Sequence, residues 1–142
     1  MRTLTYSTTT VAKNRTGKFT VKLGSVEGNE DSMSFSLQFD PKVITIDPVV
    51  SLGKDVPKSA VISTNFKRAG EGFIGVLVDA TDFYKKSPKN KEVAVFKFKV
   101  LKEPEANVSE LIFSDTPARR SLSILGGQLA EVKYNNGKVK VK

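Results

Sequence analysis

The sequence offers few side chains that could carry out chemistry. It contains no cysteine and no histidine among 142 residues, which excludes thiolate nucleophiles, disulfides, cysteine or histidine zinc sites, and histidine acid–base catalysis. Two close carboxylate pairs remain, Asp79 with Asp82 and Glu103 with Glu105. Paired carboxylates can act as acid and base, but these pairs lie at a predicted strand end and in a predicted loop. A calcium site at Asp79 and Asp82 would need more oxygen ligands, and EF-hand spacing is absent. We therefore predict a protein that is not an enzyme and that holds no metal or cofactor.

A row of hydroxyl groups is the second feature of chemical interest. In residues 32–41, "SMSFSLQFDP", apolar residues alternate strictly with small polar ones. Because side chains of a strand point alternately to opposite faces, this pattern predicts a half-buried strand with an uncharged polar face. The polar positions are Ser32, Ser34, Ser36 and Gln38. Such a face could contact a protein partner, or it could simply face solvent.

The elements that would position these side chains are strands. The apolar residues follow a period of two almost throughout, and glycine, proline and asparagine separate the runs. About nine short strands at regular spacing predict an all-β fold, either a sandwich or a barrel. The expected strands cover residues 19–23, 33–39, 43–46, 60–66, 72–80, 92–100, 109–115 and the two halves of 131–141. With no linker and no internal repeat in the sequence, we expect one domain spanning residues 1–142.

Two turns have local sequence signals. "EVKYNNGKVKV" places Asn136 and Gly137 between two alternating runs, and Asn-Gly favours the positive φ angles of a type I′ turn. The sequence therefore predicts a C-terminal hairpin. The segment "DTPARRSLSIL", residues 115–125, leaves room for a helical turn or an irregular crossover.

Two predicted strands carry apolar residues on both faces. Leu77 lies opposite the face of Ile74, Val76 and Val78, and Val93 and Val95 lie opposite Ala94, Phe96, Phe98 and Val100. These strands could be central and partly covered by loops, or they could form an apolar patch on the outside of a sheet. In the second case Leu77, Val93 and Val95 would share a surface with the serine row.

The positive charge is spread along the chain. The net charge is +8, but most lysines alternate with apolar residues, which is how exposed strands stay soluble. The one concentration is "YKKSPKNK", Tyr84–Lys91, and no nucleic-acid motif accompanies it, so we predict no nucleic-acid partner. No apolar run resembles a signal peptide or a membrane span, and composition alone does not choose between a cytoplasmic protein and a module of an exported one.

The order of these segments resembles the cohesin family, β-sandwich modules that bind dockerin domains. The resemblance rests on "GKFTVKLGSV", on "FSLQFDPKVITI" with its aromatic-Asp-Pro step, on Gly53, on "GFIGVLVDAT", on "VAVFKFKVL" and on the terminal "NGKVKV". Together these motifs extend from Thr5 to Val141. The resemblance implies a nine-stranded jelly-roll sandwich, and the departures from the cellulosomal pattern suggest a divergent, non-cellulosomal member.

The resemblance also implies a function. A dockerin would dock on the outside of one sheet, on the strands matching residues 32–39, 60–66, 72–79 and 93–100. Ser32 and Ser34 would stand where well-known cohesins carry an Asn and an Asp that hydrogen-bond the dockerin, and Leu77 would match an apolar contact. The expected partner surface comprises Ser32, Ser34, Ser36, Gln38, Leu77, Val93 and Val95. The expected location is extracellular or at the cell surface, as a module of a larger exported protein.

Two other partners remain open. The same patch could bind a second copy of the chain as a weak homodimer. A carbohydrate-binding sandwich is the alternative from another class, but sugar sites usually need a row of exposed aromatic rings. The sequence contains no tryptophan, and Tyr84 beside Phe83 is the one tyrosine in a clearly exposed predicted loop.

Overall fold

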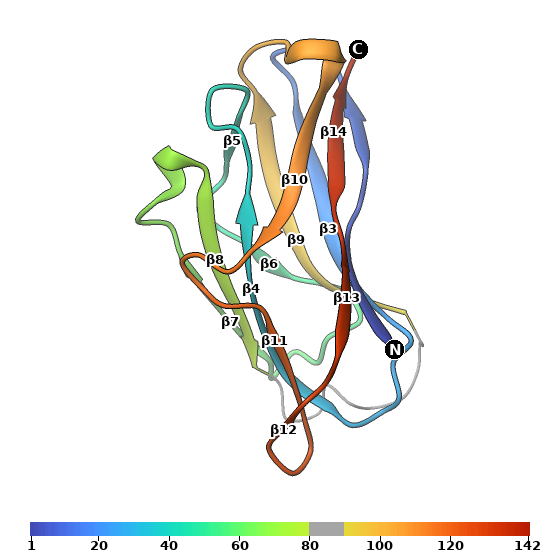
Figure 1. Ribbon diagram of the computed structural model, residues 1–142. Helices are drawn as coiled ribbons and strands as arrows, with labels where there is room; N and C mark the ends of the chain where they lie inside the picture. The colour runs from blue at the N-terminus through green and yellow to red at the C-terminus, as the bar shows by residue number, and fades with distance from the viewer. Residues whose placement is uncertain (80–89) are drawn as a thin grey trace.

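The computed structural model describes residues 1–79 and 90–142 as two β-sheets packed face to face (Figure 1). Helical structure in this part of the chain is limited to two short 3₁₀ turns, Ala69–Glu71 and Glu105–Asn107. The strands are β1 Arg2–Tyr6, β2 Thr9–Val11, β3 Thr16–Gly24, β4 Glu30–Gln38, β5 Ile44–Ile46, β6 Ser51–Leu52, β7 Val61–Asn65, β8 Phe73–Asp79, β9 Lys91–Val100, β10 Val108–Ser114, β11 Ser121–Ile124, β12 Gln128–Leu129, β13 Val132–Asn135 and β14 Gly137–Val141. The all-β jelly-roll sandwich expected from the sequence is confirmed. The described strands are more numerous than the nine expected, because edge and crossing segments such as β2, β6 and β12 are short separate strands.

Each sheet is organised around one long strand. The first sheet has the order β13-β1-β3-β9-β5, with β6 also pairing with β9. In the second sheet β4 pairs along one edge with β8, which in turn pairs with β7. The other edge of β4 pairs with β11 near its start and with β10 near its end. Strand β4, which carries the serine row, is therefore central and has neighbours on both sides.

The core forms because the alternating apolar residues of both sheets point inward. Met33, Phe35 and Leu37 of β4 are at most 2% exposed, as the sequence pattern predicts. They meet an aromatic cluster in which Tyr6 stacks on Phe113 with ring centroids 3.8 Å apart. The Tyr6 hydroxyl donates a hydrogen bond to the Ser36 carbonyl at 3.2 Å, and burial raises the pKa of that hydroxyl well above its ordinary value.

A buried ion pair joins the two sheets near the N-terminus. Arg2 of β1 donates from Nε to a Glu30 carboxylate oxygen at 2.5 Å, and Glu30 of β4 is fully buried. Burial tends to raise the pKa of Glu30, but hydrogen bonds from Arg2 and from the backbone amides of Glu27 and Gly28 outweigh it, so the pKa is lowered. The pair is satisfied by these bonds and links the first strand of one sheet to the central strand of the other.

The expected C-terminal hairpin is wrong. Strands β13 and β14 do not pair with each other; β13 runs parallel to β1 in the first sheet, and β14 runs parallel to β2 and antiparallel to β10 in the second. The chain crosses between sheets at Asn136, whose side-chain oxygen accepts a hydrogen bond from the Phe113 amide at 2.9 Å. A Cβ atom at Gly137 would lie 2.5 Å from the carbonyl oxygens of Tyr6 and Ser7. Glycine is therefore needed here for a close crossing of two chain segments and not for a type I′ turn.

Candidate protein-binding face

The outer side of the second sheet presents two cross-strand rows of side chains, defined by the pairing registers. Strands β11, β4, β8 and β7 lie side by side, and the inward rows between these positions are core residues such as Met33, Leu122 and Val78. We call this surface the serine face. Its first row is Leu129, Ser123, Ser32, Asp79 and Val61, and its second row is Ser121, Ser34, Leu77 and Ser63.

The hydroxyls of the serine face bond to one another across the β4–β11 pair. The hydroxyls of Ser32 and Ser123 are 2.7 Å apart, and those of Ser34 and Ser121 are 2.9 Å apart. Ser34 also donates to the Arg119 carbonyl at 2.6 Å, and Ser123 donates to the Asp31 carboxylate. The sequence-predicted Ser32 and Ser34 are half-buried and lie on the outer face as expected. Their hydroxyls are held in fixed positions by neighbours within the sheet.

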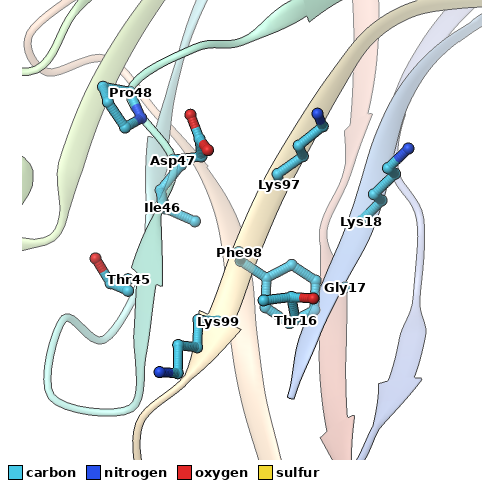
Figure 2. Close-up of a pocket in the computed structure, with 10 residues that line it drawn as sticks. All are labelled: Thr16, Gly17, Lys18, Thr45, Ile46, Asp47, Pro48, Lys97, Phe98 and Lys99. Carbon is cyan, nitrogen blue, oxygen red and sulfur yellow. The ribbon is translucent and has the colours of Figure 1, made fainter. Parts of the chain in front are cut away.

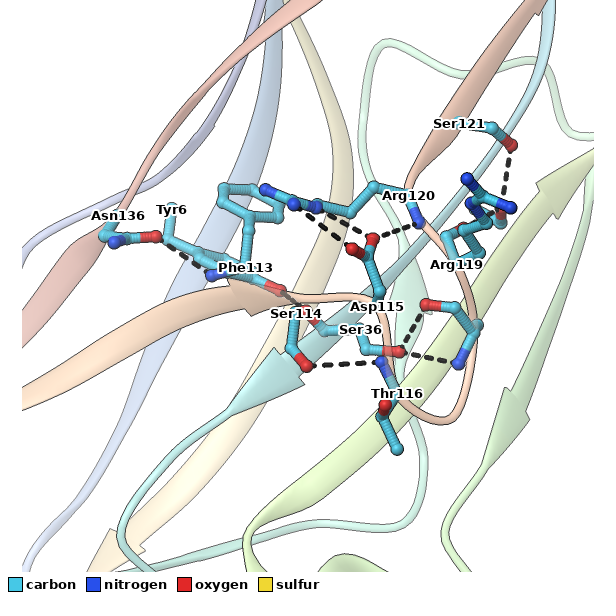
Figure 3. A network of polar contacts seen from close by, with 12 residues as sticks. Tyr6, Ser36, Phe113, Ser114, Asp115, Thr116, Arg119, Arg120, Ser121 and Asn136 are labelled. Carbon is cyan, nitrogen blue, oxygen red and sulfur yellow. Dashed lines mark hydrogen bonds and ion pairs between the residues drawn. The ribbon is translucent and has the colours of Figure 1, made fainter.

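Ser36 is not available to a partner. It is fully buried, because residues 116–119 cross over it and over Gly75. Its hydroxyl donates to the Ala118 carbonyl and accepts from the Ala118 amide, both at 2.7 Å. Figure 3 marks two hydrogen bonds at the Ser36 side chain with dashed lines. A Cβ at Gly75 would lie 3.0 Å from the Pro117 ring, so glycine gives this segment room. The expectation that Ser36 belongs to an open surface is wrong, because residues 116–119 cover it. Of the two alternatives expected for residues 115–125, an irregular crossover is present up to residue 120, and residues 121–124 form strand β11.

The crossing segment is held at its ends by charge. Asp115 accepts hydrogen bonds from the Arg120 backbone amide at 3.0 Å and from Arg120 Nε at 2.9 Å (Figure 3). These bonds lower the pKa of the Asp115 carboxyl to about 2 and raise the pKa of Arg120. The Arg120 guanidinium also lies 5.0 Å from the centre of the Tyr134 ring. The segment therefore forms a fixed wall at one end of the serine face.

Two predicted site residues lie on the other sheet. Val93 and Val95 belong to β9, which pairs with β3, β5 and β6 and not with β4 or β8. Val93 is fully buried in the core, next to a register shift in the β3–β9 pair, and Val95 is half-buried opposite Thr20 and Ser51. Placing them with the serine row was wrong, because the side of a strand on which a residue lies does not tell which sheet the strand joins.

The apolar part of the serine face is larger than the sequence predicted. Leu77 is 45% exposed in the second row, beside Ser34 and Ser63. Val61 and Leu129, which the sequence reasoning missed, are 60% and 71% exposed at opposite ends of the first row. The sequence feature that could have indicated them is an apolar residue at an outward-facing position of a short strand. Gln38 is exposed beyond the crossing segment, in a groove of ≈ 630 Å³ that also contains Lys102, Glu103 and Glu105.

Comparison with known proteins identifies the architecture. No family model and no curated protein matches the sequence. Solved structures do match, among them the third ScaC cohesin of Acetivibrio cellulolyticus, solved in complex with the ScaB dockerin. It has a TM-score of 0.83 at 18% identity, with 99% of each chain covered. The protein has a cohesin-like fold.

Other solved structures with this fold include a cohesin in complex with a dockerin and a non-cellulosomal cohesin. A Clostridium thermocellum OlpA cohesin, solved with a dockerin, superposes with a TM-score of 0.83 at 16% identity over 100% of this chain and 99% of that one. A non-cellulosomal cohesin from the hyperthermophilic archaeon Archaeoglobus fulgidus superposes with a TM-score of 0.80 at 14% identity, over 99% of this chain and 91% of that one. At these identities the comparison establishes the fold.

Features that would favour other functions are weak in the described residues. The large apolar side chains exposed in residues 1–79 and 90–142 are all aliphatic, so that part of the cohesin-like fold provides no row of aromatic rings for a sugar. Within the same ranges no group of three acidic side chains could hold a metal ion, and no helix is long and apolar enough to cross a membrane. Asp82, Phe83, Tyr84 and most of the basic segment Tyr84–Lys91 lie outside the described residues.

Proposed function

We propose that this chain is a single, non-catalytic protein-binding domain, and that its partner docks on the serine face. The observation that supports this most directly is the exposure of Leu77, Val61 and Leu129 on a sheet surface whose hydroxyls are already paired. Interfaces combine exposed apolar side chains of this kind with polar ones. Hydroxyls held in place lose little conformational freedom when a partner binds, which favours affinity.

The partner that we propose is a dockerin-type domain. Proteins with the same fold have been solved in complex with dockerins. The serine face contains three of the four strands on which the family resemblance would place a dockerin, those matching residues 32–39, 60–66 and 72–79. A dockerin-binding domain would act as a module of a larger exported protein, outside the cell or at its surface. A second copy of the chain is the competing partner for the same face.

Calorimetry tests the proposal against a panel of type I and type II dockerins. Leu77→Ala should weaken binding by about 1–2 kcal/mol or more, because apolar anchors near the centre of an interface dominate its energy. Ser34→Arg places an unpaired cation in the contact and should abolish binding. Val95→Ala is the matched control, because Val95 lies on the other sheet and its truncation should leave affinity unchanged.

Two results would contradict the proposal in different ways. Undiminished dockerin binding by Leu77→Ala and Ser34→Arg would place the interface elsewhere on the protein. If no dockerin binds, and sedimentation instead shows self-association that Leu77→Ala weakens, then the face is an interface between copies and the dockerin proposal is wrong. Thermal unfolding of each variant shows whether the fold is retained.

A further inference from the structure

A cleft lies on the outer side of the first sheet, on the side of the sandwich opposite to the serine face. The outer surface of β3, β9 and β5 forms a cleft of ≈ 550 Å³. Lys18, Lys97 and Lys99 line it together with Thr16 and Asp47. Figure 2 shows the Lys18 and Lys97 side chains extending side by side from neighbouring strands, with Lys99 further along β9. We call this site the lysine cleft.

The lysine cleft carries positive charge that forms no ion pair within residues 1–79 and 90–142. Lys18 and Lys97 are directly opposite each other in the β3–β9 pair, an arrangement of like charges that destabilises a sheet. None of the ion pairs in the described residues involves Lys18, Lys97 or Lys99. Asp47 is the one carboxylate lining the cleft, and it accepts a hydrogen bond from the Val49 amide at 2.8 Å. Such a concentration of one sign of charge in a concave site attracts an anion.

The spacing of the lysines and the other side chains of the cleft indicate which class of anion it would bind. Lys97 and Lys99 are two residues apart on one strand, about 7 Å, which is also the distance between alternate side chains of an extended peptide. The ring of Phe98 is only 2% exposed, so it offers no stacking surface for a nucleic-acid base or a sugar. The charged groups are lysines and not the arginines that favour bidentate phosphate contacts.

We propose that the lysine cleft binds an extended acidic peptide segment with carboxylates at alternate positions. This site is separate from the serine face, because the two lie on the outer sides of different sheets. A protein with both sites would hold two different partners at once.

The test uses a synthetic peptide of alternating Glu and Thr, labelled for fluorescence anisotropy, at low salt. The double variant Lys18→Gln/Lys97→Gln should raise the Kd about tenfold, as expected for the loss of two surface ion pairs. The matched control is Lys138→Gln/Lys140→Gln on exposed positions of β14, which removes the same charge from another sheet and should change the Kd less than about twofold. Leu77→Ala should leave peptide binding unchanged, whether or not the serine face binds a dockerin.

Three outcomes would overturn the proposal. Equal losses in the two double variants would show attraction to net charge and not to the cleft. Equal affinity for a peptide with its Glu residues clustered would remove the spacing argument. Tighter binding of an oligonucleotide or a polyuronate, with the same loss in Lys18→Gln/Lys97→Gln, would make the occupant a different polyanion. Thermal unfolding excludes a folding defect, since removal of the Lys18–Lys97 repulsion should leave Tm unchanged or higher.

Discussion

Replacing Ser36 with alanine tests whether its hydroxyl holds residues 116–119 in place at one end of the serine face. The hydroxyl makes two hydrogen bonds of 2.7 Å to Ala118 and is fully buried. Each such bond contributes about 0.5–1.5 kcal/mol. Alanine has nearly the shape of serine and leaves no large cavity, so the loss is mainly polar. Because Ala118 is half-buried, water can replace part of the lost bonding, and we expect a loss of about 2 kcal/mol.

Chemical denaturation and thermal unfolding measure this loss. For a chain of this size, about 2 kcal/mol should lower Tm by about 6–8 °C. Ser34→Ala is the control, because Ser34 also makes two hydrogen bonds but is half-exposed. There water replaces the partners, and the cost should stay below about 0.5 kcal/mol. Hydrogen exchange at the Ala118 amide should also accelerate more in Ser36→Ala than exchange in the core strands.

Equal losses of stability in the two serine variants would contradict this prediction. If Ser36→Ala and Ser34→Ala cost the same free energy of unfolding within error, the buried hydroxyl does not hold residues 116–119 in place. The wall at the end of the serine face would then depend on the Asp115–Arg120 pair alone. A loss of stability in Ser36→Ala without faster exchange at Ala118 would place its effect in the core, not in the crossing segment.

Three further predictions concern charge and close packing. The pKa of Glu30 is lowered in the folded protein, so its stabilising effect is present above its ordinary pKa of 4.5 and is lost as the pH falls through the folded value. Glu30→Gln should flatten this acid dependence in denaturation curves. It should cost about 1.5–3 kcal/mol at pH 7 by removing the buried charge-assisted hydrogen bond, while Arg2 keeps its contacts with Glu27 and Asn29. Gly137→Ala should cost about 3 kcal/mol or more in the same assay, since its Cβ would meet two backbone oxygens at 2.5 Å. NMR titration should find the Asp115 carboxyl with a pKa of about 2, rising toward 3.8 in Arg120→Ala.

Local periodicity was sufficient to predict most of the side chains that enter the core. Val93 is an exception, because it lies at a register shift in the β3–β9 pair and is buried although the alternation assigns it to the outer face. Phe19, Val21 and Leu23 are fully buried, as are their counterparts in β4 and the inward residues of β9. The alternation of side chains is a property of one strand and needs no knowledge of its neighbours. For the same reason the outward positions of Ser32 and Ser34 could be predicted.

Strand pairing could not be predicted in the same way. The neighbours of β4 are β8, β10 and β11, which follow it by tens of residues in the sequence. A pattern of period two shows that the side chains of Val95 and Phe96 point to opposite faces of β9. It does not show which sheet β9 joins. For the same reason the sequence did not predict that the serines bonded to Ser32 and Ser34 belong to β11. Residues 115–125, which include these serines, were expected to form a helical turn or an irregular crossover, and the strand β11 was not predicted.

Long-range pairing also overrode the strongest local turn signal. Asn136 and Gly137 would suit a type I′ hairpin, but neither adopts a positive φ. Strand β13 instead pairs with β1, and β14 with β10 and β2, so the two halves of the segment belong to different sheets. Closing a hairpin would leave β1 and β2 without these partners. The glycine serves the crossing, where any side chain would collide with Tyr6 and Ser7.

The size of the serine face limits how a partner can use it. The two open rows run over at most five strands about 4.8 Å apart, from β12 to β7, and cover roughly 300 Å² of surface. A stable protein complex buries about 800 Å² on each partner, so a partner confined to the two rows would bind weakly. The exposed apolar residues Val61 and Leu129 lie at opposite edges of the face, and Leu125 extends the second edge into the turn before β12. The crossing segment blocks extension past Ser36. A partner that binds tightly must therefore extend past the β7 edge and the β12 edge, and contact the apolar residues at both.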